Sequence, residues 1–97
     1  NSFVSGVLYI DVDPEVDRIY FYNKSQPTIK VEVSEYNLYN SPSWWFPIST
    51  GRVVLFPSDT VHEVKIKEKD NERISLAFNV FIKGMLGNAR ELTELKI

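Results

Sequence analysis

One histidine, His62, and no cysteine occur in the chain, so few residues are available for metal or nucleophilic chemistry. An imidazole can bind a metal ion or transfer a proton near neutral pH. The alternation over residues 61–67 predicts a strand with His62 on its apolar face and charged side chains opposite. We therefore expect His62 to point inward, either as a core histidine with one hydrogen bond or as a metal ligand. A site that needs two histidines or a thiolate cannot be built from this chain alone.

Residues 73–83 predict a longer strand with two different faces. The even positions are all apolar, namely Ile74, Leu76, Phe78, Val80 and Ile82. The odd positions mix polar with apolar side chains, namely Arg73, Ser75, Ala77, Asn79 and Phe81. If the odd face lies inside the protein, Arg73 needs an anionic partner, and a carboxylate is the natural bidentate partner of a guanidinium. A solvated Arg73 at the start of an ordinary strand is the alternative.

Aromatic residues supply two further candidates. Residues 3–12 predict an apolar strand to which Tyr9 adds a hydroxyl, either as a core tyrosine with one backbone partner or as a donor to a ligand. Trp44 and Trp45 lie in a stretch that reads as a loop. They are either a platform for a sugar or substrate, or a cover over the edge of a sheet.

Strand signals recur along the chain, and no helix of normal length is predicted. Further strands are predicted at residues 18–22, 28–33 and 52–56, a loop at residues 34–47, and a short strand or helical turn at residues 91–97. Roughly seven short strands separated by turns indicate an all-β domain, a β-sandwich or jelly roll. Such a fold brings the inward positions of different strands together.

The length and charge of the chain restrict its partners. Its 97 residues suffice for one domain. With 11 Lys and Arg against 13 Asp and Glu, the net charge is −2, so we expect no nucleic-acid partner and no membrane partner. The chain begins at Asn1 without an initiator Met or a signal peptide and enters strand-like sequence at once. We expect a cytoplasmic chain cut from a longer protein.

Three runs of the sequence resemble one enzyme family. They are Asn1-Ser2-Phe3-Val4-Ser5-Gly6-Val7-Leu8-Tyr9, then Gly51-Arg52-Val53-Val54-Leu55-Phe56-Pro57-Ser58 followed by His62, and Arg73-Ile74-Ser75-Leu76-Ala77-Phe78-Asn79. The chain is similar over nearly its whole length to the iron(II)- and 2-oxoglutarate-dependent oxygenases, in a prolyl-hydroxylase-like branch common in marine bacteria and phages. The resemblance implies a double-stranded β-helix, that is, a cupin-like jelly roll, in agreement with the strand pattern.

The resemblance also implies roles for single residues. His62 matches the second histidine that binds iron, and Arg73 matches the basic residue that holds the distal carboxylate of 2-oxoglutarate. Tyr9, Ser75 and Asn79 are implied to assist at the co-substrate. The implied activity is hydroxylation of an unknown small molecule or peptide, with Fe(II), 2-oxoglutarate and O2.

One departure from the family matters. There, the first histidine and its partner ligand precede the Asn-Ser-x-x-Ser-Gly motif, with which this chain begins. We expect that two metal ligands and the outer helices lie upstream, and that this chain neither holds iron tightly nor turns over. The even face of residues 73–83 is then partly bare, and we expect the chain to form a dimer or larger assembly through that face or through an unpaired edge strand. The alternatives are a non-catalytic jelly-roll interaction module and a carbohydrate-binding module that uses Trp44 and Trp45.

Overall fold

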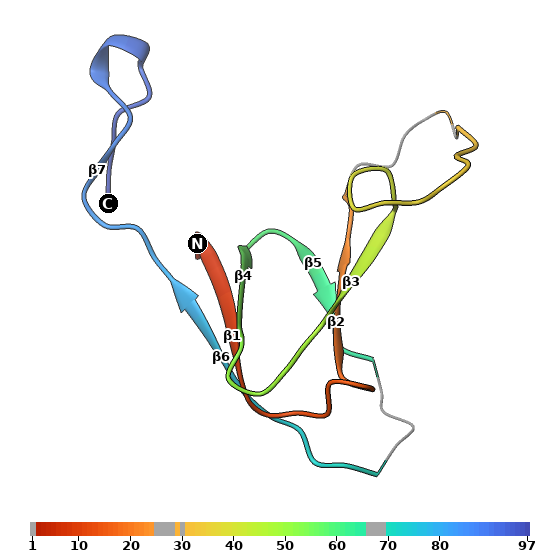
Figure 1. Cartoon of the computed structure of the whole chain (residues 1–97). Helices are drawn as coiled ribbons and strands as arrows, with labels where there is room; N and C mark the ends of the chain where they lie inside the picture. Colours follow the sequence, from red (N-terminus) through yellow and green to blue (C-terminus); the bar gives the residue numbers. More distant parts are fainter. Residues whose placement is uncertain (1, 25–28, 30, 66–69) are drawn as a thin grey trace.

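The computed structural model describes residues 2–24, 29, 31–65 and 70–97 (Figure 1). In its first sheet, β1 (Val4–Asp11) lies between β4 (Val53–Pro57) and β6 (Ile74–Val80), and both pairings are antiparallel. These bounds confirm three predicted strands within a few residues. The pairing of β1 with β6 shifts by one residue between Tyr9 and Asp11.

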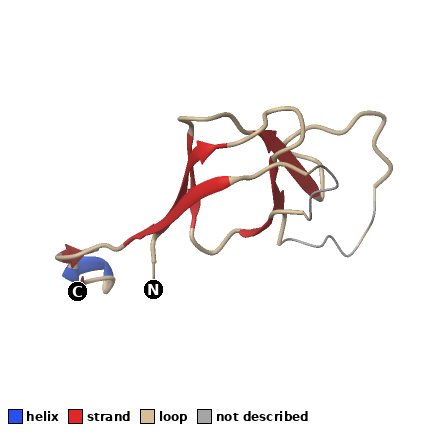
Figure 2. Cartoon of the chain, turned by 90° about the horizontal axis from the view of Figure 1, so that it is seen from below, coloured by secondary structure: helices blue, strands red, loops and turns tan. Residues whose placement is uncertain are grey.

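In the second sheet, β2 (Arg18–Tyr22) lies between β3 (Ser43–Pro47) and β5 (Val61–Glu63). A C-terminal hairpin pairs β7 (Met85–Leu86) with β8 (Leu95–Lys96) around the 3-10 helix η1 (Ala89–Glu91), and it projects from the end of β6, away from the larger sheets (Figures 1 and 2). The described part of the chain contains no α-helix, so it is all-β, as predicted. None of its helical segments has the length and hydrophobicity needed to span a bilayer.

The predicted loop over residues 34–47 is wrong at its end, because β3 forms there. This strand pairs with β2 along its whole length, from Arg18 opposite Pro47 to Tyr22 opposite Ser43. Three consecutive aromatic residues favour a strand at this position. Pro47 is tolerated because β3 is an edge strand and Pro47 is its last residue.

Two further predictions need correction. The strand expected at residues 28–33 does not form at the described residues 29 and 31–33, while 28 and 30 lie outside the described residues. Alternation stabilises a strand only against a neighbouring strand, and Ile29 and Val31 are 76% and 77% exposed. The strand expected at residues 61–67 ends at Glu63; positions 66 and 67 again lie outside the described residues.

A small core lies between the two larger sheets. Its buried apolar residues are Tyr9, Val12, Ile19, Ile48 and Phe56, with Val7, Phe21 and Val54 packed against them. The rings of Phe21 on β2 and Phe56 on β4 link the sheets edge to face, with centroids 5.1 Å apart. The radius of gyration is 17.6 Å, whereas roughly 12–13 Å is typical of a compact chain of this length. The chain therefore leaves much apolar surface open.

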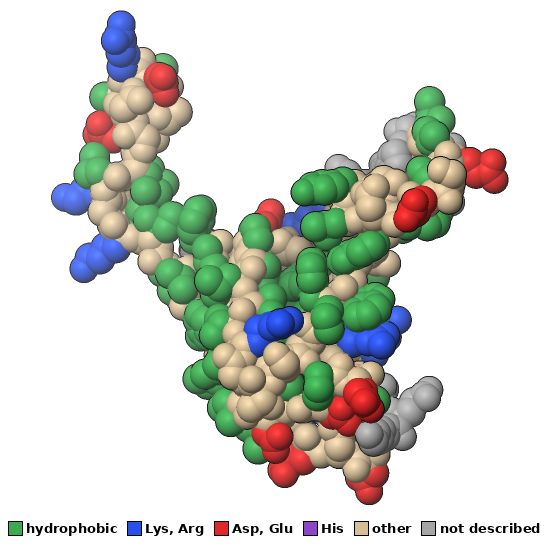
Figure 3. Space-filling view, in the orientation of Figure 1, with side chains coloured by type: hydrophobic (Ala, Val, Ile, Leu, Met, Phe, Trp, Pro, Cys, Tyr) green, Lys and Arg blue, Asp and Glu red, His purple; other side chains and the backbone are tan. Residues whose placement is uncertain are grey.

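The face of the first sheet that points away from this core is apolar and exposed. The register places Leu8 opposite both Val53 and Leu76, so the three side chains share this face. Its most exposed members range from 41% to 61% exposure, namely Val53, Leu55, Ile74, Leu76 and Val80. Hydrophobic side chains gather along β6 in the space-filling view (Figure 3). The even face of the 73–83 strand is bare, as expected.

Gly6 lets its neighbours close over the centre of β1. It lies opposite Leu55 on one side and Phe78 on the other. A Cβ atom added at Gly6 would lie 2.6 Å from Phe78 Cε2 and 2.8 Å from Leu55 Cδ2. These separations are too short for van der Waals contact, so at least one neighbouring side chain would have to move.

We expect Gly6→Ala to lower the free energy of unfolding by about 1–3 kcal/mol, the range of an overpacked site. Urea unfolding followed by circular dichroism measures the loss. In a Phe78→Leu background the same change should cost less, because the ring atoms that the new Cβ meets are gone. Strictly additive losses in the double variant would contradict this explanation.

Candidate functional site

Most of the predicted site residues lie on the inner face of the first sheet. The register places Tyr9 opposite Ser75, and Ser5 opposite both Asn79 and Phe56, and directly opposite residues share a face. Phe56 belongs to the core between the sheets, so this face is turned toward the second sheet. Of the two readings of the 73–83 strand, the inward odd face is the one observed, although Ser75 and Asn79 remain exposed.

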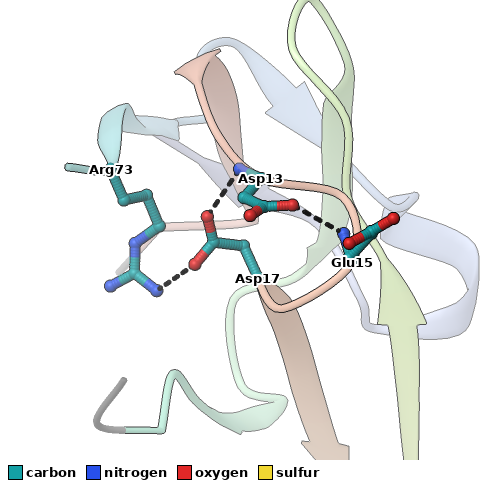
Figure 4. A network of polar contacts seen from close by, with 4 residues as sticks. All are labelled: Asp13, Glu15, Asp17 and Arg73. Carbon is teal, nitrogen blue, oxygen red and sulfur yellow. Dashed lines mark hydrogen bonds and ion pairs between the residues drawn. The ribbon is translucent and has the colours of Figure 1, made fainter. Parts of the chain in front are cut away.

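Arg73 lies directly before β6 and forms an ion pair with Asp17, which lies directly before β2 (Figure 4). Arg73 Nη1 lies 3.8 Å from Asp17 Oδ1, and the side chains are 27% and 0% exposed, respectively. A buried carboxylate is costly unless it is paired and hydrogen-bonded. The chain itself therefore provides an anionic partner for the inward guanidinium.

A tight turn holds Asp17 in place. The backbone N–H of Asp13 donates to Asp17 Oδ2 at 2.8 Å, and the N–H of Asp17 donates to the carbonyl oxygen of Asp13 at 2.8 Å. The N–H of Glu15 donates to Asp13 Oδ1 at 3.0 Å, which is an Asx turn. These bonds leave the Asp17 carboxylate little freedom to follow the arginine.

Tyr9 is a buried phenol next to this ion pair. It is 2% exposed, and its hydroxyl has no hydrogen-bond partner among the described residues. Burial raises the pKa of Tyr9 above its ordinary value; the charge of Arg73 lowers the pKa and that of Asp17 raises it. A buried hydroxyl without a partner costs about 1–3 kcal/mol. The structure thus places an unused donor beside a half-buried cation, an arrangement that fits a carboxylate ligand.

His62 lies on β5 with its ring against the core aromatics. The ring centroids of His62 and Phe56 are 4.5 Å apart, and Nδ1 lies 2.9 Å from the carbonyl oxygen of Thr60. A carbonyl only accepts, so Nδ1 donates this hydrogen bond, and in the neutral imidazole Nε2 is then the nitrogen that can bind a ligand. His62 faces the inner side, as predicted, but it is exposed and not part of a closed core.

The described residues do not complete a metal site. No group of three or more His, Cys, Asp or Glu side chains among them is arranged to hold a metal ion. His62 can therefore offer one imidazole to an iron ion, and the remaining ligands are not found in this part of the chain. Non-haem Fe(II) sites typically use a facial triad of two histidines and one carboxylate.

Hydroxyl groups of two sequence motifs form a network that ties the first sheet together. Ser5 Oγ donates to Asn79 Oδ1 at 2.8 Å and lies 2.9 Å from Ser58 Oγ, which in turn lies 2.7 Å from Ser2 Oγ. Asn79 thus links β6 to β1 through Ser5. Ser58 connects the turn after β4 to β1, four residues before His62.

An apolar cleft of about 500 Å³ lies next to His62. Its lining includes Leu38 and Phe46, together with Phe21 and Phe56, whose rings both contact His62. Arg73 and Tyr9 are not part of its lining. The structure therefore brings Arg73, Tyr9 and Ser75 together, while His62 packs against Phe21 and Phe56 beside the cleft.

A comparison with protein-family models identifies the family of the chain. A family model described as "Putative 2OG-Fe(II) oxygenase" matches residues 1–79, so the chain belongs to this family of iron(II)- and 2-oxoglutarate-dependent oxygenases. No curated protein matched the chain. No solved structure matched it either.

Asp17 is the site residue that the sequence analysis missed. The argument that an inward Arg73 needs an anionic partner was correct, but it named no side chain of the same protein as that partner. The signal was the turn pattern Asp13-Pro14-Glu15-Val16-Asp17 directly before a strand. Asp17 pairs with Arg73 across 56 positions (73 − 17), and local periodicity cannot predict so distant a contact.

Tyr9→Phe should change how stability depends on pH. Because the pKa of Tyr9 is raised in the folded chain, the phenol ionises more readily in the unfolded chain. Its contribution is fully present below about pH 10, the pKa of an unperturbed phenol, and is lost as the pH rises further. The unfolding free energy of the natural chain should therefore fall more steeply above about pH 10 than that of Tyr9→Phe. Parallel curves in a urea series would contradict this, as would a large loss of stability in the variant at pH 7.

Proposed function

We propose that this chain forms the co-substrate side of an Fe(II)- and 2-oxoglutarate-dependent dioxygenase that hydroxylates its substrate. The observation that carries the proposal is the half-buried Arg73 next to the unpartnered hydroxyl of Tyr9, on the inner face of the sheet. A carboxylate at this position would satisfy both groups. Membership in the oxygenase family supports 2-oxoglutarate as the source of this carboxylate.

In this proposal Arg73 binds the distal carboxylate of 2-oxoglutarate, and Tyr9 donates a hydrogen bond to it. Ser75, opposite Tyr9, adds a second hydroxyl. Asn79 acts indirectly, through the hydrogen bond that it accepts from Ser5. His62 binds the iron through Nε2, while its Nδ1–H donates to the carbonyl oxygen of Thr60 and fixes the ring. Iron, 2-oxoglutarate and O2 supply the oxidising chemistry, and the protein contributes binding, orientation and exclusion of water.

We further propose that the two sheets are part of a jelly roll, a double-stranded β-helix. The support is that two antiparallel three-stranded sheets face each other across an aromatic contact. The candidate ligands lie on the faces that meet. Such a fold places its metal and co-substrate between the sheets, where strands of both can contribute.

The 97-residue polypeptide itself is proposed to be inactive. With one histidine in the sequence and no three-residue metal cluster among the described residues, His62 alone cannot hold Fe(II) tightly. The polypeptide should therefore release no CO2 from 2-oxoglutarate. The complete open reading frame that encodes this segment is the appropriate protein for binding and activity measurements.

The geometry gives less support to a carbohydrate-binding module. Trp44 and Trp45 are consecutive residues of β3, so their side chains point to opposite faces of the strand and do not form one platform. The guanidinium of Arg18 lies 3.9 Å from the ring centroid of Trp45 and covers it. A non-catalytic interaction module, by contrast, would keep the sheets and show no response to the changes described next.

In the polypeptide encoded by the complete open reading frame, Arg73→Gln should weaken 2-oxoglutarate binding by about 10- to 100-fold. This is the effect of losing a hydrogen bond between two charged groups, about 1.5–3 kcal/mol. His62→Ala should abolish stoichiometric uptake of Fe(II). Anaerobic calorimetry measures the first effect, and metal analysis after desalting measures the second.

Arg90→Gln is the matched control, because it removes an exposed guanidinium from η1, outside both larger sheets. It should bind 2-oxoglutarate like the natural protein. If Arg73→Gln also bound 2-oxoglutarate normally, the proposed function would be wrong and the Arg73–Asp17 pair would be purely structural.

The bare outer face of the first sheet supports a second proposal, that the 97-residue polypeptide self-associates. Exposed apolar surface of this kind marks an interaction site, and a second copy presents the same face. Light scattering should give a mass of at least twice 11.2 kDa. Leu55→Thr with Leu76→Thr should shift the mass toward the monomer, whereas Tyr39→Thr, which changes an exposed aromatic outside the sheet, should not. A monomeric natural chain would refute the proposal.

A further inference from the structure

Asp17 is a buried carboxylate that the proposed function does not yet use. Its side chain is fully buried, is held by the N–H of Asp13, and contacts the guanidinium of Arg73, whose side chain is 27% exposed. The two partners are thus unequal: the carboxylate is fixed inside the protein, and the arginine side chain reaches solvent. An ion pair of this kind orients the exposed partner, because the buried one cannot move.

The contact uses only part of the guanidinium. Arg73 faces Asp17 through Nη1, and the other terminal nitrogen points away from Asp17 (Figure 4). A guanidinium carries five N–H donors in a rigid plane, so one edge can contact one carboxylate while another edge remains available to a second. The orientation of the plane, and therefore of the available edge, is set by Asp17.

We propose that Asp17 is a positioning residue, which orients Arg73 so that its free edge faces the distal carboxylate of 2-oxoglutarate. This inference rests on the proposed function, because it requires Arg73 to bind that carboxylate. Asp17 does not itself contact the ligand. It acts through Arg73. The hydrogen bonds of the turn from Asp13 to Asp17 hold the carboxylate in place, and the carboxylate in turn holds the guanidinium.

The alternative is that Asp17 and Arg73 only stabilise the fold. The two roles differ in their dependence on the ligand. A positioning role affects ligands that have a distal carboxylate and leaves other ligands unaffected. A purely structural role affects all ligands of the site alike, since the whole site loosens when the pair is broken.

The test measures binding of two probes to the polypeptide of the complete open reading frame loaded with Fe(II), by anaerobic calorimetry. One probe is 2-oxoglutarate and the other is 2-oxobutanoate, which has the same 2-oxo acid group but no distal carboxylate. Asp17→Asn should weaken 2-oxoglutarate binding about tenfold, equivalent to about 1.4 kcal/mol, and leave 2-oxobutanoate binding unchanged. Glu15→Gln is the matched control, because it removes an exposed carboxylate from the same turn, and it should bind both probes normally.

The results for the single and double variants distinguish the positioning role from a structural one. In an Arg73→Gln background, Asp17→Asn should have no further effect on 2-oxoglutarate, because no cation remains to be oriented. Equal losses for both probes, or normal 2-oxoglutarate binding by Asp17→Asn while Arg73→Gln is impaired, would overturn the positioning role alone. Normal binding by Arg73→Gln would overturn the proposed function instead. If Asp17→Asn does not fold, Asp17→Glu keeps the charge but displaces it, and the same contrast between the two probes is expected.

Discussion

The register of β1 is the constraint on which the rest of the structure depends. Among the described strands of the first sheet, β1 is the central one and pairs with both β4 and β6, so its alternation decides which of their side chains face the core. A slip of one residue would exchange the two faces, turning Tyr9 and Ser5 outward and Leu8 inward. Gly6 contributes to the correct register, because only a residue without a side chain allows Phe78 and Leu55 to close over it.

The inner face that results is unusual for a core, since it combines aromatic packing with polar groups. Phe56 and Phe21 provide the contact between the sheets, and Tyr9 lies in the same buried cluster. Arg73 and Asp17 then add a charge pair directly before the first residues of β6 and β2, respectively. A protein stabilised only by burial would have apolar residues at these positions, because a buried ion pair is often no more stable than a hydrophobic replacement. This favours a functional explanation for the polar end of the face.

Much of this architecture follows from the sequence, and the exceptions have physical reasons. The strands β1, β2 and β4 were predicted from short runs rich in apolar, β-branched and aromatic residues, and β6 from the alternation of an apolar and a mixed face. The strand β3 was missed because its aromatic residues lie between two prolines, and the strand at residues 28–33 was predicted wrongly because alternation cannot show whether a neighbour exists. The partner of Arg73 could be inferred as a kind of group, a carboxylate, but its identity depends on tertiary contacts.

For His62, the sequence likewise predicted which face of the strand the side chain lies on, but not how exposed the side chain is. Periodicity gives the side of a strand, whereas exposure depends on what the rest of the protein places over that side. His62 lies on an edge strand of three residues, with Phe56 on one side and open solvent on another. The family match spans residues 1–79 and therefore includes both His62 and Arg73. It relates two residues of different strands to one family, which the periodicity of each strand cannot do.

The shift of register between Tyr9 and Asp11 has a consequence for the choice of salt-bridge partner. If the pairing of Tyr9 with Ser75 continued without interruption, Asp11 would lie opposite Arg73, and the two opposite charges would form a cross-strand pair. The extra residue in β1 places Asp11 opposite Ile74 instead. Because Asp11 is exposed and Asp17 is buried, this bulge exchanges a solvent-screened surface pair for an interior one. The one-residue bulge in β1 thus determines whether Arg73, directly before β6, pairs with an exposed carboxylate or with a buried one.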